Sequence, residues 1–118
     1  MTALASTYGF TADRGATFTQ VIKYKDDSNN ALNLTGFTGV MVIRQRTNVA
    51  QIVMTLSTEN ERILIDGPTG TITLQVSASD MVIEPGRYTY TFEVTSSGGE
   101  VTRLLMGDFI VRTDVYRL

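Results

Sequence analysis

The chain has 118 residues, of which 42% are hydrophobic and 19% are charged, and its 10 basic and 12 acidic side chains give a net charge of −2. This length predicts one domain that buries a core without covalent cross-links. Cysteine and histidine are both absent, which excludes disulfides and thiol chemistry and removes the commonest transition-metal ligand and the usual general base near neutral pH. We therefore expect no catalytic residues, no cofactor and no metal site.

The distribution of charge and hydrophobicity excludes several classes of partner. Like charges are not clustered, so we expect no nucleic acid and no anionic membrane surface among the partners. No apolar run approaches the roughly 20 residues that a membrane span requires. The first residues (MTALAST) carry no basic side chain, which predicts a chain made and used without Sec export. No motif indicates a small-molecule substrate.

The first half of the chain predicts strands separated by polar turns. Residues 16–25 alternate, with Phe18 and Ile22 on one face, and residues 26–30 (DDSNN) form a turn cluster, because Asp and Asn side chains bond their own backbone. The spacing of polar side chains there also resembles the start of a calcium-binding loop, but the glycine and glutamate that such a loop needs are missing. A hydrated turn is therefore expected.

The middle of the chain continues the same pattern. Residues 39–46 predict a second long strand. Residues 50–56 predict a third, in which Ile52, Met54 and Leu56 recur at every second position and share one buried face.

Two short elements precede the C-terminal strands. Residues 63–65 and 71–77 both predict strands, and an Asp-Gly-Pro turn separates them. Residues 79–83 predict one helical turn with Ser79 as its N-cap.

Residues 87–95 form the most regular alternation in the chain, and residues 96–99 (SSGG) predict a hairpin turn after it. The side chains on the apolar face of this strand are Tyr88, Tyr90, Phe92 and Val94.

The last predicted strand, residues 101–112, does not keep one alternation throughout. Leu104 and Met106 would share a face, whereas Phe109 has the opposite parity. Gly107 stands between them and predicts a β-bulge that resets the register. Seven to eight short strands, with turns about every ten residues, predict an all-β, immunoglobulin-like antiparallel β-sandwich.

Residues 84–90 (EPGRYTY) resemble the tyrosine corner of immunoglobulin-like domains. In such a corner a Tyr near the start of a strand bonds the backbone just upstream, and the residue two positions later faces the core. Tyr88 takes the corner position and Tyr90 the core position, in which immunoglobulins have a cysteine. We predict Pro85, Gly86 and Tyr88 as the structural corner.

The two ends of the chain carry apolar side chains outside the confident strands. We predict residues 1–14 as an N-terminal arm or edge strand, residues 15–113 as the sandwich, and residues 114–118 as a C-terminal tail. Such termini either pack on their own domain or dock on a partner, for example by adding a strand to its sheet. The candidate partner-interface residues are Leu4, Tyr8, Phe10, Val115, Tyr116 and Leu118.

Several short motifs occur in one order that suggests a family. They include Ala16-Thr-Phe, Leu34-Thr-Gly, Met41-Val-Ile-Arg, Pro85-Gly-Arg-Tyr and Gly99-Glu-Val-Thr-Arg. In this order the chain resembles the small β-sandwich proteins encoded among the structural genes of tailed bacteriophages. It is also similar to the N-terminal domain of phage baseplate upper proteins. The resemblance covers residues 15 to 112.

The resemblance implies a non-enzymatic virion structural protein of the tail, neck or baseplate region. Such a protein is assembled in the host cytoplasm and docks on other virion proteins and on copies of itself through termini and sheet edges. Two alternatives stay open. One is a capsid decoration (cement) protein, and the other is an immunoglobulin-like adhesion module that binds a cell-surface ligand.

Overall fold

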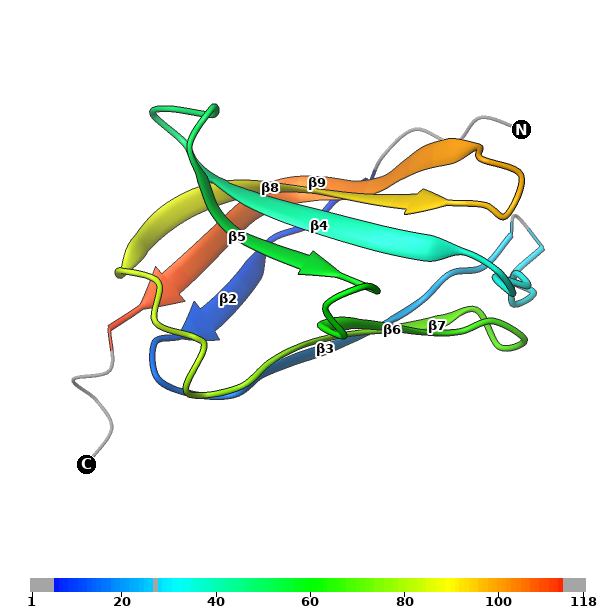
Figure 1. Cartoon of the computed structure of the whole chain (residues 1–118), viewed down its shortest axis with the longest axis horizontal. Helices are drawn as coiled ribbons and strands as arrows, with labels where there is room; N and C mark the ends of the chain where they lie inside the picture. The colour runs from blue at the N-terminus through cyan, green and yellow to red at the C-terminus, as the bar shows by residue number, and fades with distance from the viewer. Residues whose placement is uncertain (1–5, 27, 114–118) are drawn as a thin grey trace.

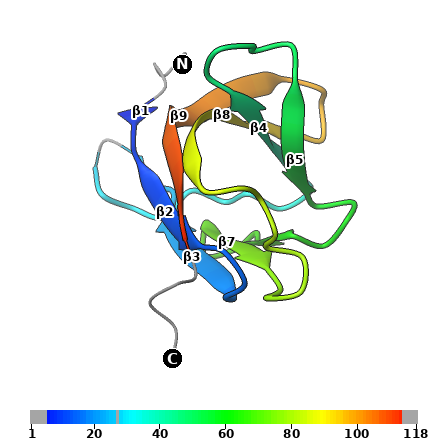
Figure 2. The same cartoon turned by 90° about the vertical axis from the view of Figure 1, so that its left-hand side faces the viewer.

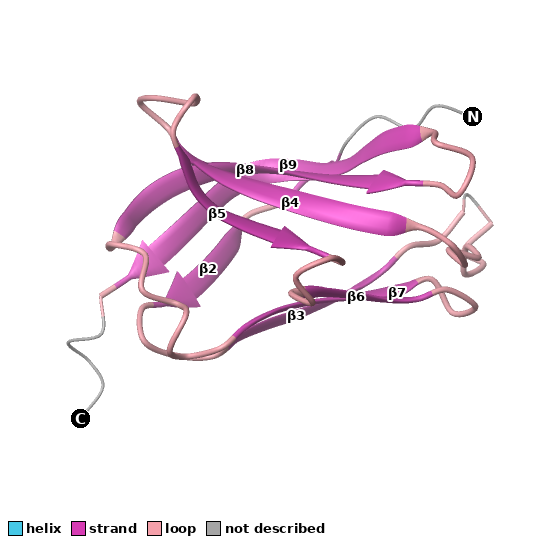
Figure 3. Ribbon diagram, viewed as in Figure 1, coloured by secondary structure: helices cyan, strands magenta, loops and turns pink. Residues whose placement is uncertain are grey.

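The computed structural model describes residues 6–26 and 28–113. These residues contain nine β-strands and no helix, and hence no helix that could cross a membrane. Figures 1 and 3 show the strands as two layers packed face to face. The all-β prediction is confirmed.

Six strands form the larger sheet and three form the smaller one. The larger sheet contains β1 (Ser6–Thr7), β2 (Phe10–Asp13), β9 (Val101–Arg112), β8 (Gly86–Thr95), β4 (Thr38–Gln45) and β5 (Ile52–Ser57). The smaller sheet contains β3 (Phe18–Lys23), β7 (Thr71–Val76) and β6 (Ile63–Asp66). Both β1 and β2 run parallel to β9 in one continuous register, so the arm can be counted as one interrupted strand, which makes eight.

The order of the strands is that of an immunoglobulin-like sandwich. Strands β4, β8 and β9 correspond to C, F and G of that fold, and β3, β7 and β6 correspond to B, E and D of the opposite sheet. All pairs other than those of the arm are antiparallel. Because the first strands join the larger sheet, β3 remains an edge of the smaller one (Figure 2).

The core lies between the two sheets and is built from the alternating apolar faces of the strands. At one end it holds a cluster of aromatic rings, in which Phe10 lies 5.1 Å from Tyr90 and 6.1 Å from Phe18 between ring centroids. Phe109 completes the cluster at 5.4 Å from Phe18. Aromatic rings at these separations add to the stabilisation that burial alone gives. The cluster therefore fastens the arm to both sheets.

The predicted bulge at Gly107 is wrong, because the register of β9 changes at Leu104. The β8–β9 pairing slips by one residue beside Phe92 and leaves Leu104 without a cross-strand partner. Gly107 stays in register opposite Tyr90. A side chain at Gly107 would collide with the backbone of Tyr8, so this glycine makes room for the arm.

The alternation predicted for β5 is wrong at its first residue, Ile52, which does not share the face of Met54 and Leu56. The β4–β5 register shifts between Ile43 and Arg44, and this irregularity turns Ile52 outward, where it is 48% exposed. Leu56 is buried and Met54 packs against the core from a half-buried position. The helical turn predicted for residues 79–83 is displaced, because a single turn is closed over residues 77–81.

That single turn begins earlier than predicted. The Met81 N–H donates to the Ser77 carbonyl at 2.9 Å, so Ser77 rather than Ser79 opens it. In the turn cluster after β3, the Asp26 carboxylate accepts the backbone N–H groups of Ser28 and Asn30 at 2.9 and 3.0 Å. This carboxylate therefore closes a turn, as Asp commonly does.

Candidate functional site

The predicted partner-interface residues separate into two groups. Tyr8 is 53% exposed on the arm. Phe10 is 2% exposed, and its place among partner-interface residues is corrected: it belongs to the domain's own core, because β2 pairs with β9 and turns Phe10 inward. The other predicted interface residues, Leu4, Val115, Tyr116 and Leu118, lie outside the residues that the structure describes.

Tyr8 is held by its backbone while its ring stays at the surface. Its N–H donates to the Met106 carbonyl at 2.9 Å, and its carbonyl accepts the Tyr90 hydroxyl at 2.6 Å. Burial, followed by the charge of Tyr8, raises the pKa of Tyr90 above its ordinary value of 10.0, so this hydroxyl remains a donor at neutral pH. At the end of the arm, the Arg112 guanidinium binds both oxygens of Asp13 at 2.7 and 3.2 Å.

The residues predicted as a corner lie where β8 begins. The Tyr88 hydroxyl donates to the Glu84 carbonyl at 2.6 Å, which is the contact of a tyrosine corner. Pro85 and Gly86 form the bend between these two partners. Burial and then the Glu84 carboxylate raise the pKa of Tyr88. The corner is a structural feature that fixes the path of the chain into β8.

An apolar hollow of about 230 Å³ lies between the arm and β3. The hollow is lined by Tyr8, Phe10, Gln20, Val21, Ile22 and Leu105. Val21 belongs to β3, which is an edge strand of the smaller sheet, and it is 58% exposed. Apolar side chains thus meet an open sheet edge at this place.

The open edge carries backbone groups that no described strand uses. Tyr24 donates its N–H to the Gly70 carbonyl at 2.8 Å, which continues the β3–β7 ladder. In an antiparallel pair the hydrogen-bonding direction alternates, so the backbone groups of Thr19 and Val21 point away from β7. An extended segment could pair with them as an added strand.

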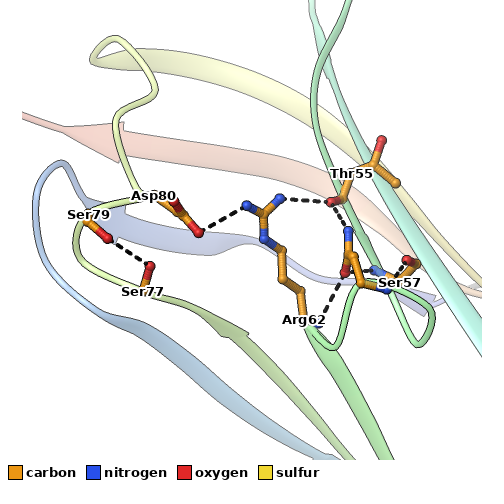
Figure 4. A network of polar contacts seen from close by, with 7 residues as sticks. Thr55, Ser57, Arg62, Ser77, Ser79 and Asp80 are labelled. Carbon is orange, nitrogen blue, oxygen red and sulfur yellow. Dashed lines mark hydrogen bonds and ion pairs between the residues drawn. The ribbon is translucent and has the colours of Figure 1, made fainter.

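A second hollow, of about 440 Å³, is polar and lies beside Arg62. Figure 4 shows the guanidinium of Arg62 between Asp80, at 3.2 Å, and the carbonyl of Thr55, at 3.2 Å. Asn60 also donates to the Thr55 carbonyl, at 3.0 Å. Arg62 and Asn60 therefore occupy the Thr55 carbonyl on the open edge of β5. Arg62 also links this edge to the turn that contains Asp80.

The acidic residues do not gather into a reactive group in the described part of the chain. Within residues 6–26 and 28–113, no three side chains of the kinds that bind metals lie together. Asp80 pairs with Arg62, and Glu84 lies 3.6 Å from Arg14. These contacts are partly exposed ion pairs at turns, which contribute little to stability.

Sequence reasoning missed the outer face of the larger sheet. The alternation of β8 places Thr89 and Thr91 on that face. The pairing of β8 with β4 and β9 sets Thr91 between Val42 and Met106. No local signal could reveal this row, because it joins residues far apart in the chain.

No model of a known protein family matches the chain, and no curated protein shows significant similarity to it. Among solved structures, the crystal structure of CopC from Methylosinus trichosporium OB3b is similar over 88% of this chain and 85% of its own, at 14% identity and a TM-score of 0.48. Extracellular domains 3–5 of Drosophila OTK are similar over 87% of this chain and 32% of their own length, at 14% identity and a TM-score of 0.36.

A third similar structure is a parallel homodimer of the extracellular domain of the voltage-gated sodium channel beta4 subunit. It covers 96% of this chain and 89% of its own, at 10% identity and a TM-score of 0.34. Similarities at this level carry no inference about ligand, partner or site. The fold assignment rests on the strand order of this chain.

Proposed function

We propose that this chain is a non-enzymatic structural protein of a tailed-phage virion, in the tail, neck or baseplate region. It docks on neighbouring virion subunits through its sheet edges and the surface of its arm. The observation that carries the proposal is the open edge of β3 beside the apolar hollow under Tyr8. An unpaired edge next to apolar side chains is the arrangement that an added strand requires.

The three other edges of the two sheets, at β5, at β6 and at the arm, are protected from pairing, which supports the choice of β3. On β5 the side chains of Arg62 and Asn60 occupy the Thr55 carbonyl. On β6 only four residues are available, and they end at Asp66. On the arm side the edge is interrupted, with two residues in β1 and four in β2. Short strands and occupied backbone groups are among the ways in which edges are protected from pairing. Strand β3 has six residues and carries one lysine, Lys23, at its last position.

The placement in a phage particle is supported by the order of motifs described above. On the surface of this domain, Arg62, Arg103 and Arg112 are paired with carboxylates of the same chain. This pairing is consistent with docking through the shape of the domain and its strand edges. The arm, which the Tyr90 hydroxyl holds in place, forms one wall of the hollow beside the docking edge.

A charged side chain at the β3 edge tests the proposal. Val21→Lys places an ammonium at the open edge, beside the hollow, and edge lysines oppose strand addition. We expect at least about tenfold less of this variant in assembled particles, which corresponds to about 1.4 kcal/mol of docking free energy. The measurement is quantitative mass spectrometry of particles purified from cells that express the variant.

The matched control is Leu64→Lys on β6, the other edge of the smaller sheet. Leu64 is 47% exposed and Val21 is 58% exposed, so both substitutions add a charge to an exposed apolar position. The control should enter particles at the wild-type level. Equal incorporation of the two variants would sink the proposal that β3 is the docking edge.

A further inference from the structure

The outer face of the larger sheet carries an uncharged row that crosses five strands. Strand registers place its members side by side, from β5 through β4, β8 and β9 to β1. Because residues in register share a face and Tyr90 and Phe92 point into the core, the intervening Thr91 and its row point outward. The row consists of Thr55, Val42, Thr91, Met106 and Thr7.

A second row on the same face carries opposite charges at its two ends. Thr89 of β8 lies between Arg44 of β4 and Asp108 of β9. Adjacent strands are about 4.8 Å apart, so the Cα atoms of Arg44 and Asp108 lie at similar distances on either side of β8. Within the described residues, neither Arg44 nor Asp108 forms a salt bridge. The Arg44 guanidinium donates one hydrogen bond, to the Val49 carbonyl at 2.9 Å, and its charge has no carboxylate partner there.

We propose that a second copy of this chain packs on the outer face of the larger sheet, about a two-fold axis that lies in the interface along β8. Such an axis exchanges the positions of β4 and β9. It brings Arg44 of each copy over Asp108 of the other, and Val42 over Met106. Thr91 lies on the axis and meets its own copy. An interface of this kind is isologous, since one patch supplies both halves of every contact.

The choice of a second copy follows from this self-complementarity. Arg44 and Asp108 are placed so that the same face of a second copy offers an opposite charge to each of them. An unrelated partner would have to carry a carboxylate and a cation at the same two positions. Two charged residues of β8 itself, Arg87 and Glu93, would meet their own copies. Aligned sheets cross at about 30°, which separates the two copies of Arg87, the residue farther from Thr91. Glu93 already pairs with Arg103 of its own chain at 3.1 Å.

The proposed dimer contact lies on a different surface from the β3 docking edge, and its partner is a second copy of this chain. It does not require that the chain belong to a virion, so failure of the docking proposal would leave it standing. A dimer formed by this face leaves β3 free, because β3 lies in the opposite sheet.

Sedimentation equilibrium of the purified full chain tests the dimer. The wild-type chain should dimerise within the accessible concentration range, up to about 1 mM, where even weak contacts are populated. Thr91→Glu puts two like charges on the axis and should weaken dimerisation at least tenfold. Thr73→Glu, in the middle strand of the smaller sheet, is the matched control and should dimerise like the wild-type chain.

Charge reversal gives a second, more specific readout. Arg44→Asp and Asp108→Arg should each weaken the dimer, and the double variant should restore it, because the pair is only inverted. Mixing the two single variants should yield a heterodimer, in which both contacts are again complementary. Circular dichroism checks that each variant is folded.

Three results would overturn the inference. The first is a wild-type chain that stays monomeric throughout the concentration range. The second is a Thr91→Glu variant that is folded and dimerises like the Thr73→Glu control. The third is a double charge reversal that remains as weak as the single ones.

Discussion

The hydroxyl of Tyr90 holds the arm by a side chain from the middle of the larger sheet. Its ring is buried among Phe10 and the rest of the aromatic cluster, and its hydroxyl reaches the carbonyl of Tyr8 at 2.6 Å. Tyr90 thus holds the arm in two ways, by the packing of its buried ring and by the hydrogen bond of its hydroxyl. Loss of the hydroxyl would leave the ring in place and remove only the polar contact.

Tyr90→Phe isolates that contact. We expect the free energy of unfolding to fall by about 1–2 kcal/mol, because a buried hydrogen bond is lost and the Tyr8 carbonyl is left without this donor. Urea denaturation of the variant and the wild-type chain measures the difference. An unchanged midpoint would show that the hydroxyl does not hold the arm.

The same variant carries a pH signature. The folded-state pKa of Tyr90 is raised above its ordinary value of 10.0, so the unfolded chain loses this proton first as the pH rises. The contribution of Tyr90 to stability is complete below pH 10 and declines above it. Tyr90→Phe should therefore lose stability less steeply than the wild-type chain between pH 10 and the onset of alkaline unfolding.

The arm is the element whose placement depends most on distant residues. Alternation within the chain was sufficient to predict β7 and β8, because their apolar residues recur at every second position and pack on one core. It was not sufficient for the arm, which pairs with β9 across almost the whole length of the chain. Phe10 was consequently assigned to a partner, and Gly107 to a bulge, although both residues serve the same parallel pairing.

Gly107→Ala tests that interpretation of the arm. The added methyl group would meet the backbone of Tyr8, and overpacking of this kind costs about 1–3 kcal/mol. We expect the arm to detach in part, which amide hydrogen exchange would detect as faster exchange in β2 than in β7. Gly98→Ala, at a hairpin position where the nearest atom is 3.8 Å away, is the control and should leave exchange in the arm unchanged.

The whole molecule is a sandwich with a closed core and distinct outer surfaces. The fold class could be predicted because strand number, turn spacing and the tyrosine corner are local properties of the sequence. The surfaces could not, because the row through Thr91 and the open edge of β3 depend on which strands become neighbours. We propose two separate contacts on these surfaces: a second copy over Thr91 and its row, and a strand from another subunit along the β3 edge.

We propose that this chain is a structural part of a virion and docks through β3. A reconstruction of the particle produced by the genome that encodes the chain tests it most directly. We expect many copies of the sandwich, each with a neighbouring subunit's strand along β3 and over Val21. Particles that lack the chain, or copies whose β3 edge faces only solvent, would contradict the account.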